Sequence, residues 1–422
     1  MKTFYPHIVT SLKDYSKEKF LKDIIAGVIV AIIALPLSIA LAIASGVGPE
    51  VGLYTAIVAG FIISLLGGSP VQIAGPTAAF ASIVAGIVLT KGMGSLVIAT
   101  VMAGIILVVM GILRLGNLIK FIPHSITVGF TAGIAVTIAI GQVKDFLGLS
   151  FKTSPVETIE KIEAIVKSIT TVNLWGLFIG AVALAILVFL PKVLPKIPAS
   201  LIAVLVCAAT VKLANLPVNT IGALYPDITS APPKFSIPDF NVDTLINVIP
   251  DAVTIAVLAA VESLLSCVVA DGMVGSKHNS NTELIAQGLG NVGSALFGGI
   301  PATGAIARTA ANIKNGGRSP VAGITHAIVL FFVLILFMPY AKLIPMPAIA
   351  AILFVVAYNM SEYKKFASIC KERNPVNILV LVLTFTLTVV FDLVVAICAG
   401  LAIHYIIVLF NKIFKKRTEK IS

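Results

Sequence analysis

The chain has 422 residues, of which 58% are hydrophobic and 12% charged, and its mean hydropathy is +1.06. This composition excludes a soluble globular domain and indicates an integral membrane protein. The formal net charge of +11 is concentrated at the two ends, since five lysines precede residue 23 and residues 412–422 carry four lysines and an arginine. The basic surplus therefore predicts that both termini are cytoplasmic, and it does not indicate a nucleic-acid partner.

Apolar runs recur along the chain and predict an all-α polytopic protein with fourteen transmembrane segments in the lipid bilayer. An even number agrees with two cytoplasmic ends. The expected segments are 23–45, 50–67, 76–90, 94–113, 117–147, 173–190, 198–215, 245–270, 281–298, 303–314, 319–338, 346–360, 375–391 and 393–411.

Two stretches interrupt this pattern. Residues 148–172 place apolar side chains at helical spacing between charges, which predicts an amphipathic surface helix. Residues 216–244 are rich in proline and aspartate and are expected to form a linker between the halves, outside the cell.

The two shortest segments share a Gly/Pro-rich approach. Residues 66–70 (LGGSP) and 297–301 (FGGIP) precede them, and each is followed by a Thr-Ala-Ala sequence, at 77–79 and 309–311. The copies lie an odd number of segments apart, so they have opposite orientations. Short, interrupted segments at matching places in two halves indicate a transporter site near the middle of the membrane.

A helix that begins inside the membrane leaves backbone N–H groups without partners, and these groups attract an anion. We expect the two half-helices to begin near Pro76-Thr77 and Thr303-Gly304 and to point toward each other. The two threonines serve either as N-caps or as ligand donors. The predicted substrate-binding residues are Gly75, Pro76, Thr77, Ala78, Ala302, Thr303, Gly304, Ala305 and Arg308.

Arg308 is a lone basic residue deep within an apolar region. A charge at this depth costs ~2.5–3.5 kcal/mol on insertion scales, so we interpret Arg308 as functional. Its positive charge would contribute a favourable electrostatic field at the anion site and would occasionally contact the anion. The alternative is that Arg308 lies near a helix end and extends to the lipid headgroups.

Glu262 lies near the middle of the apolar run 256–270, with Ser266 on the same helix face as a supporting residue. Burial favours the protonated carboxyl group and a nearby arginine favours the carboxylate, so Glu262 is a candidate proton-coupling residue. The alternative is a permanent ion pair with Arg308.

Other patterns are weak. Residues 288–293 spell GxGxxG inside an apolar segment, which favours helix-packing glycines over nucleotide binding. Pro36 is expected to kink the first segment beside the site. The cysteines show no metal-type spacing and no enzyme motif is present, so we expect no cofactor, no metal site and no enzymatic activity.

Five stretches together resemble the SulP family, the sulfate permease or solute carrier 26 family of anion transporters. They are 25–60, 74–80 (AGPTAAF), 261–273 (VESLLSCVVADGM), 281–291 (NTELIAQGLGN) and 299–320 (GIPATGAIARTAANIKNGGRSP). Glu262 and Arg308 look closest to bacterial dicarboxylate-type members, which makes sodium coupling less expected than proton coupling.

The resemblance implies seven-plus-seven inverted repeats of the UraA-like fold, a homodimer and elevator-type alternating access. It assigns 23–116 and 245–338 to a core (transport) domain and 117–215 and 346–411 to a gate domain. Residues 1–22 and 412–422 would be cytoplasmic tails. Family members usually continue into a cytoplasmic STAS domain, which is not found in this sequence.

The sequence therefore predicts a secondary active transporter of the plasma membrane that moves a dicarboxylate, sulfate or bicarbonate, with a proton as the coupling ion. Two alternatives stay open: a nucleobase-type proton symporter of the same architecture, and an anion channel or voltage-responsive membrane protein.

Overall fold

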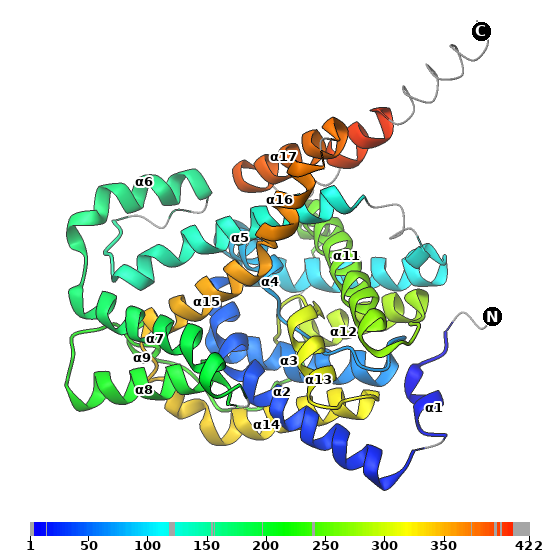
Figure 1. Ribbon diagram of the computed structural model, residues 1–422, viewed down its shortest axis with the longest axis horizontal. Helices are drawn as coiled ribbons and strands as arrows, with labels where there is room; N and C mark the ends of the chain where they lie inside the picture. Colours follow the sequence, from blue (N-terminus) through cyan, green and yellow to red (C-terminus); the bar gives the residue numbers. More distant parts are fainter. Residues whose placement is uncertain are drawn as a thin grey trace, which may run out of the picture.

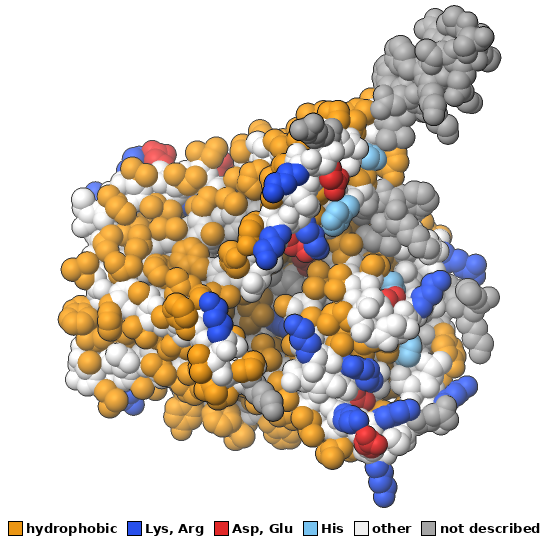
Figure 2. Space-filling view, viewed as in Figure 1, with side chains coloured by type: hydrophobic (Ala, Val, Ile, Leu, Met, Phe, Trp, Pro, Cys, Tyr) orange, Lys and Arg blue, Asp and Glu red, His pale blue; other side chains and the backbone are white. Residues whose placement is uncertain are grey.

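The computed structural model describes residues 4–13, 15–117, 123–152, 155, 157–195, 197–238, 241–372, 374–391, 395, 396 and 399–407. Regular structure in these residues is almost entirely α-helical, which confirms the predicted all-α class. Within these described ranges, eight apolar helical segments are long enough to cross a membrane. Large apolar side chains are exposed over much of the surface, and Figure 2 shows how widely they spread. Contact with lipid explains that exposure.

The first half of the chain contains most of the long helices. Its elements are α1 (His7–Ser11), α2 (Lys17–Ala44), α3 (Pro49–Leu66), β1 (Ala74–Gly75), α4 (Ala78–Ile112), α5 (His124–Leu147), α6 (Thr158–Ser168), the 3-10 turn η2 (Ile169–Thr171), α7 (Leu174–Val193) and α8 (Ala199–Leu213).

The second half repeats this order after two short helices in the connection between the halves. The elements are α9 (Ile221–Leu224), α10 (Val242–Asn247), α11 (Ile249–Val274), α12 (Ser280–Leu296), β2 (Thr303–Gly304), α13 (Ile306–Lys314), α14 (Pro320–Ala341), α15 (Met346–Met360), α16 (Tyr363–Lys371) and α17 (Pro375–Val390). The described residues 399–407 of the last expected segment, 393–411, are also helical.

The two halves run in opposite directions. Strands β1 and β2 pair antiparallel, with Ala74 opposite Gly304 and Gly75 opposite Thr303. Helix α4 matches α13 and α14 together, because Gly92 adopts φ 83° and divides α4 into a short and a long part. This conformation has a positive φ, which glycine adopts without a Cβ clash. The predicted arrangement of seven-plus-seven inverted repeats is confirmed.

One amphipathic helix was predicted and a second was not. Helix α6 lies within the predicted stretch 148–172, and α16 occupies the matching place in the second half. The stretch 363–371 (YKKFASICK) is short and carries three lysines, so its sequence pattern does not identify it as a helix.

The helices pack into two groups. The first group contains α2, α3, α4, α11, α12, α13 and α14, and the second contains α5, α7, α8, α15, α16 and α17. Figure 1 shows α7, α8 and α15 on one side of the molecule and α11, α12 and α13 on the other. Both strands contact helices of the first group: β1 contacts α3, and β2 contacts α11.

The glycines of the GxGxxG pattern pack helices against each other, as predicted. A Cβ on Gly288 would lie 2.4 Å from the carbonyl oxygen of Gly104, and a Cβ on Gly104 would lie 2.6 Å from that of Gly288. Helices α4 and α12 therefore approach closely at this pair.

Some helices begin at other residues than the expected membrane segments. Helix α2 begins at Lys17 instead of residue 23, because the Ser16 hydroxyl caps it by accepting a hydrogen bond from the Lys19 N–H at 3.2 Å. Helix α5 begins at His124, after Pro123, whereas we expected residue 117; residues 118–122 of that segment lie outside the described part. The basic tail 412–422 also lies outside it.

The linker 216–244 is not a free connection. Tyr54 donates a hydrogen bond to the Ala231 carbonyl at 3.0 Å, and Lys342 donates one to the Pro226 carbonyl at 2.9 Å. The Ser236 N–H also donates to the Leu296 carbonyl at 2.8 Å. The linker is thereby attached to helices of the first group.

Candidate functional site

Two helix N-termini meet at the β1–β2 pair. Helix α4 begins at Ala78, three residues after Gly75, and α13 begins at Ile306, two residues after Gly304. Thr77 and Ala305 occupy the N-cap positions, and the Ala305 N–H donates a hydrogen bond to the Ile73 carbonyl at 2.9 Å. The sequence prediction that the Pro76 and Gly304 regions lie close together agrees with this pairing. The first-turn N–H groups of both helices lack partners within their helices.

Buried polar side chains fix the extended stretch that leads to α4. The Thr309 hydroxyl accepts a hydrogen bond from the Ile73 N–H at 3.0 Å. The Asn312 side-chain amide donates one to the Val71 carbonyl at 2.9 Å. Both side chains belong to α13, so the tip of α4 is positioned by contacts with the opposite half of the chain.

The stretch before α13 is held in a similar way. The Asn291 side chain accepts from the Ala302 N–H at 2.9 Å and donates to the Ala302 carbonyl at 2.8 Å. The Thr303 hydroxyl donates to the Ala259 carbonyl at 3.0 Å. Ala302 and Thr303 therefore lie within the support of the site, and both are fully buried.

Arg308 is almost completely buried, with 1% of its surface exposed. Its Nη2 donates to the Ser38 hydroxyl at 3.2 Å and to the Pro76 carbonyl at 3.1 Å. Its Nε and Nη1 atoms are buried and have no hydrogen-bond partner. The idea that Arg308 extends to the headgroups is wrong, because the guanidinium group lies between α2 and the β1–α4 junction.

Gly75 allows this approach. A Cβ at position 75 would lie 2.2 Å from Arg308 Nη1, so the guanidinium group in its present position occupies space that a side chain at position 75 would need. A Cβ on Gly304 would likewise lie 2.2 Å from the Gln72 side-chain nitrogen.

Glu262 does not pair with Arg308. Among the described residues, the ion pairs found include neither side chain, and Glu262 instead accepts a hydrogen bond from the Thr77 hydroxyl at 2.9 Å. The alternative of a permanent ion pair is therefore wrong. Both side chains of the Thr77–Glu262 pair are partly exposed, although the residues around them are buried.

Of the two alternatives for the threonines, N-cap or ligand donor, side-chain capping is not observed for either residue. Thr77 is at the N-cap position of α4, but its hydroxyl group makes no capping hydrogen bond. Thr303 lies in β2, two residues before the N-cap of α13. The Thr-Ala-Ala sequence at 309–311 lies inside α13, so its match to 77–79 does not mark equivalent helix starts.

The remaining predicted residues lie around the helix tips. Ala78 is the first residue of α4 and is buried. Pro36 is buried within α2, two residues from Ser38. Ser266 is buried and its hydroxyl donates a hydrogen bond of 3.5 Å to the Thr309 hydroxyl, which in turn holds the stretch that leads to α4.

Sequence reasoning missed two participants. Ser38 has no distinctive pattern, because serine is common in membrane helices. Glu283 is fully buried, and its carboxylate accepts hydrogen bonds from the Gly68 and Ser69 N–H groups at 2.9 and 3.2 Å and from the Gln72 and Gln287 amides at 2.8 and 2.9 Å. A carboxylate within a membrane segment was the available signal.

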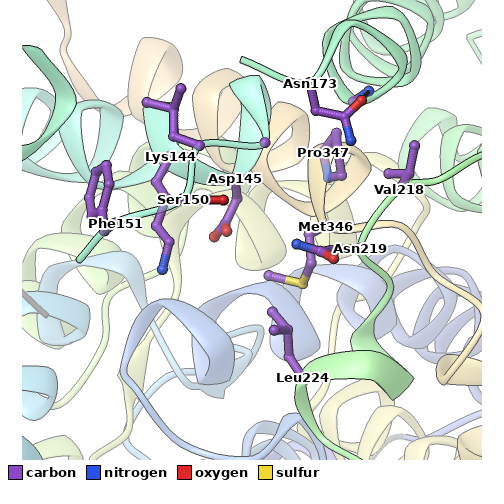
Figure 3. A pocket seen from close by; sticks show the side chains of 13 residues that line it. Lys144, Asp145, Ser150, Phe151, Asn173, Val218, Asn219, Leu224, Met346 and Pro347 are labelled. Atoms are coloured by element: carbon purple, nitrogen blue, oxygen red, sulfur yellow. Dashed lines mark hydrogen bonds between the residues drawn. The ribbon is translucent and has the colours of Figure 1, made fainter. Parts of the chain in front are cut away.

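A cavity of about 260 Å³ lies away from this site, in the second group of helices. Figure 3 shows the Asp145 carboxylate pointing into it, with Lys144 and Asn219 nearby. None of the predicted site residues lines this cavity.

Comparison with known sequences gives a consistent family assignment. The sulfate permease family matches residues 20–384. "Putative sulfate transporter YvdB" of Bacillus subtilis is 45% identical over 396 residues, which cover 93% of this chain and 74% of that protein. The bicarbonate transporter BicA of Synechocystis sp. is 31% identical over 374 residues, which cover 85% of this chain and 64% of that protein.

Solved structures agree. The transmembrane domain of a cyanobacterium bicarbonate transporter, BicA, matches with a TM-score of 0.81 and 29% identity, covering 91% of this chain and 98% of that one. SLC26A9 matches with a TM-score of 0.86 and 20% identity, covering 96% of this chain and 68% of that one, and this likeness concerns the fold alone. The predicted UraA-like fold is confirmed. The chain belongs to the sulfate permease family and is a multi-pass membrane anion transporter rather than an enzyme.

Proposed function

We propose that the chain carries a sulfate, bicarbonate or dicarboxylate ion in a site formed by the N-termini of α4 and α13. The observation that supports this most is the pair of buried, unpartnered donors on Arg308, Nε and Nη1. A buried cation with unused N–H groups is unfavourable until an acceptor satisfies it. An oxyanion supplies both negative charge and acceptors, and the first-turn N–H groups of the two helices add to its binding.

The names of two relatives narrow the substrate class. YvdB is called a sulfate transporter and BicA a bicarbonate transporter, so both names point to small oxyanions. A fumarate-like dicarboxylate offers the same acceptor chemistry in a longer molecule. Uracil is the matched negative control, because it lacks an anionic oxygen, and competition by uracil but not by the oxyanions would contradict the proposal.

Glu262 is proposed to couple anion movement to a proton. Its carboxylate lies one hydrogen bond from Thr77, the N-cap residue of α4. A proton on Glu262 would remove a negative charge from the neighbourhood of the incoming anion, so protonation and anion binding favour each other. Thr77 links protonation of Glu262 to anion binding, because its hydroxyl donates a hydrogen bond to Glu262 and its backbone forms the N-cap of α4.

We further propose an elevator motion in which the first group of helices is the transport domain, 23–116 and 245–338, and the second group is the gate domain, 117–215 and 346–411. Every residue of the proposed anion site belongs to the first group or to the strands that it holds. The site would then move as one unit relative to the second group. A homodimer is the assembly that we expect.

The proposed location is the plasma membrane, with both termini cytoplasmic. Figure 2 shows Lys and Arg side chains gathered on the side of the molecule that carries the N-terminus. Figure 1 shows α6 far from that terminus. This distribution agrees with the preference of basic side chains for the cytoplasmic side.

Uptake by proteoliposomes under an inward pH gradient tests the coupling. In the wild-type protein the gradient should drive accumulation of the labelled anion. Glu262→Gln should keep anion binding and lose the stimulation by the gradient, because glutamine does not carry the proton. Glu163→Gln, an exposed partner of Lys167 on α6, is the control. Full proton stimulation in Glu262→Gln would refute the role of Glu262.

A further inference from the structure

A second cavity, of about 290 Å³, lies between the two groups of helices. Helices α4 and α11 of the first group face α5 and α17 of the second across it. The start of α6 covers one side through Thr158 and Lys161, which lie three residues apart and so share a helix face. The amphipathic helix α6 thus contributes to a cavity instead of only lying on the surface.

One wall of this cavity reaches the proposed anion site. Ala79, the second residue of α4, lines it, and Ser82 follows on the same face of the helix. Ser82 is exposed and Ala79 is buried, so the cavity extends from an open end toward the helix tip. Water occupies about 30 Å³ in the liquid, so the cavity can hold a small anion together with water molecules.

In the part of the chain that the structure describes, the charged side chains that line the cavity are Glu157, Lys161 and Asp251. Asp251 is neutralised by Lys91, with 2.6 Å between the carboxylate and Nζ. The Glu157 carboxylate accepts a hydrogen bond from the backbone at the start of α6 as part of a capping box. Lys161 is half-buried, and among the described residues no hydrogen bond or ion pair is found for its ammonium group.

Burial also affects this ammonium group. Loss of hydration lowers the pKa of Lys161 from its ordinary value, and the nearby Glu160 partly opposes that shift. Glu160 lies nearby but does not form an ion pair with Lys161, so a bound anion stabilises this half-buried ammonium group, in the same way as Arg308 at the deeper site.

Building on the proposed function, we propose that this cavity is the outer vestibule of the transport path, and that Lys161 is an anion-binding residue that holds the incoming oxyanion before it reaches the tip of α4. The contact is a single charge-assisted hydrogen bond from a flexible side chain. It therefore attracts anions from the outer side and does not select strongly among them.

Uptake of labelled sulfate, bicarbonate and fumarate into right-side-out membrane vesicles tests this proposal. Lys161→Gln should raise the KM for the external anion about ten-fold, which corresponds to about 1.4 kcal/mol, and leave the maximal rate nearly unchanged. Lys161→Arg should restore the KM. Lys167→Gln, on the same helix but paired with Glu163, is the matched control and should behave as the wild type.

Efflux from the same vesicles gives the KM for the internal anion, which is compared with the KM for the external anion. The KM for the internal anion should not change in Lys161→Gln, because the vestibule belongs to the outer side. An unchanged external KM, or equal changes on both sides, would overturn the assignment of Lys161. Absence of saturable transport by the wild-type protein would instead refute the proposed function, so the two failures are distinguishable.

The rate of a cysteine-labelling reaction tests the vestibule without measuring transport, so it also distinguishes a loss of binding from misfolding of the variant. Ser82→Cys, in a background in which the exposed Cys370 and also Cys398 are replaced by serine, should react with a membrane-impermeant negatively charged thiol reagent added outside. Saturating sulfate should slow that reaction in the presence of Lys161 and much less with Lys161→Gln. Lack of reaction from the outside, or equal protection in both proteins, would contradict the vestibule.

Discussion

The residue that defines the site is Arg308, and its neighbour Gly75 determines whether the guanidinium group fits. Arg308 is buried between α2 and the β1–α4 junction with donors unused. A lone buried charge is destabilising, so its retention in this position is best explained by a ligand that compensates it.

Gly75→Ala tests this close approach. The added Cβ would overlap Arg308 Nη1, so the guanidinium group must shift by more than an ångström or the strand must move. We expect anion affinity to fall by at least about ten-fold, a loss of about 1.4 kcal/mol, as measured by equilibrium binding of a labelled anion.

Gly94→Ala is the control for this variant, because no atom lies within 4 Å of a Cβ at position 94. It should bind the anion as the wild type does and unfold at the same or a higher temperature, since alanine favours the helix. Normal affinity in Gly75→Ala would show that the position of the guanidinium group does not matter for binding.

At the scale of elements, the extended stretches that lead into α4 and α13 depend on buried polar side chains. Glu283 accepts four hydrogen bonds and fixes residues 68–72, which precede β1. Asn291 fixes the equivalent stretch before β2. The helix tips keep their position because these contacts replace the missing helical hydrogen bonds.

Glu283→Ala should therefore destabilise the protein by about 3 kcal/mol or more, because it leaves two backbone N–H groups and two amides buried without acceptors. Thermal unfolding in detergent measures this change. Glu18→Ala, an exposed residue paired with Lys22, is the control and should unfold at nearly the wild-type temperature. Equal unfolding temperatures would mean that Glu283 does not support the stretch.

The elements also show how far sequence reasoning extends. Hydropathy located nearly all of the segments, and the Gly/Pro-rich stretches at 66–70 and 297–301 located the two broken helices, because both signals depend on local composition. The pairing of Glu262 with Thr77 and of Arg308 with Ser38 depends on side-chain directions across distant helices, which spacing along the chain does not determine. The short helix α16 lacked a sufficiently long periodic pattern.

For the molecule as a whole, the division into two groups of helices implies relative movement. Ser82 on α4 and Thr137 on α5 line the same cavity from opposite groups. Cysteines at both positions, joined by a short bifunctional thiol reagent in the background without Cys370 and Cys398, should stop transport while anion binding persists. This separation of binding from transport is expected if the two groups of helices must move relative to each other.

The matched control is a cross-link between cysteines introduced at Ser82 and at Thr254 on α11. Thr254 lies in the same group of helices as Ser82 and lines the same cavity. Cross-linking that pair should leave transport largely intact, because both residues move together. Equal transport by the two cross-linked proteins would exclude an elevator motion between the groups.

Equilibrium binding of labelled sulfate, bicarbonate and fumarate to the purified protein and to Arg308→Met tests the central claim most directly. Methionine fills similar space without charge, so the variant should fold with equal or greater stability and lose at least about ten-fold in affinity. Lys314→Gln, an exposed change on the same helix, should bind as the wild type. Undiminished affinity in a folded Arg308→Met variant would contradict the assignment of the anion site to Arg308 and the two helix tips.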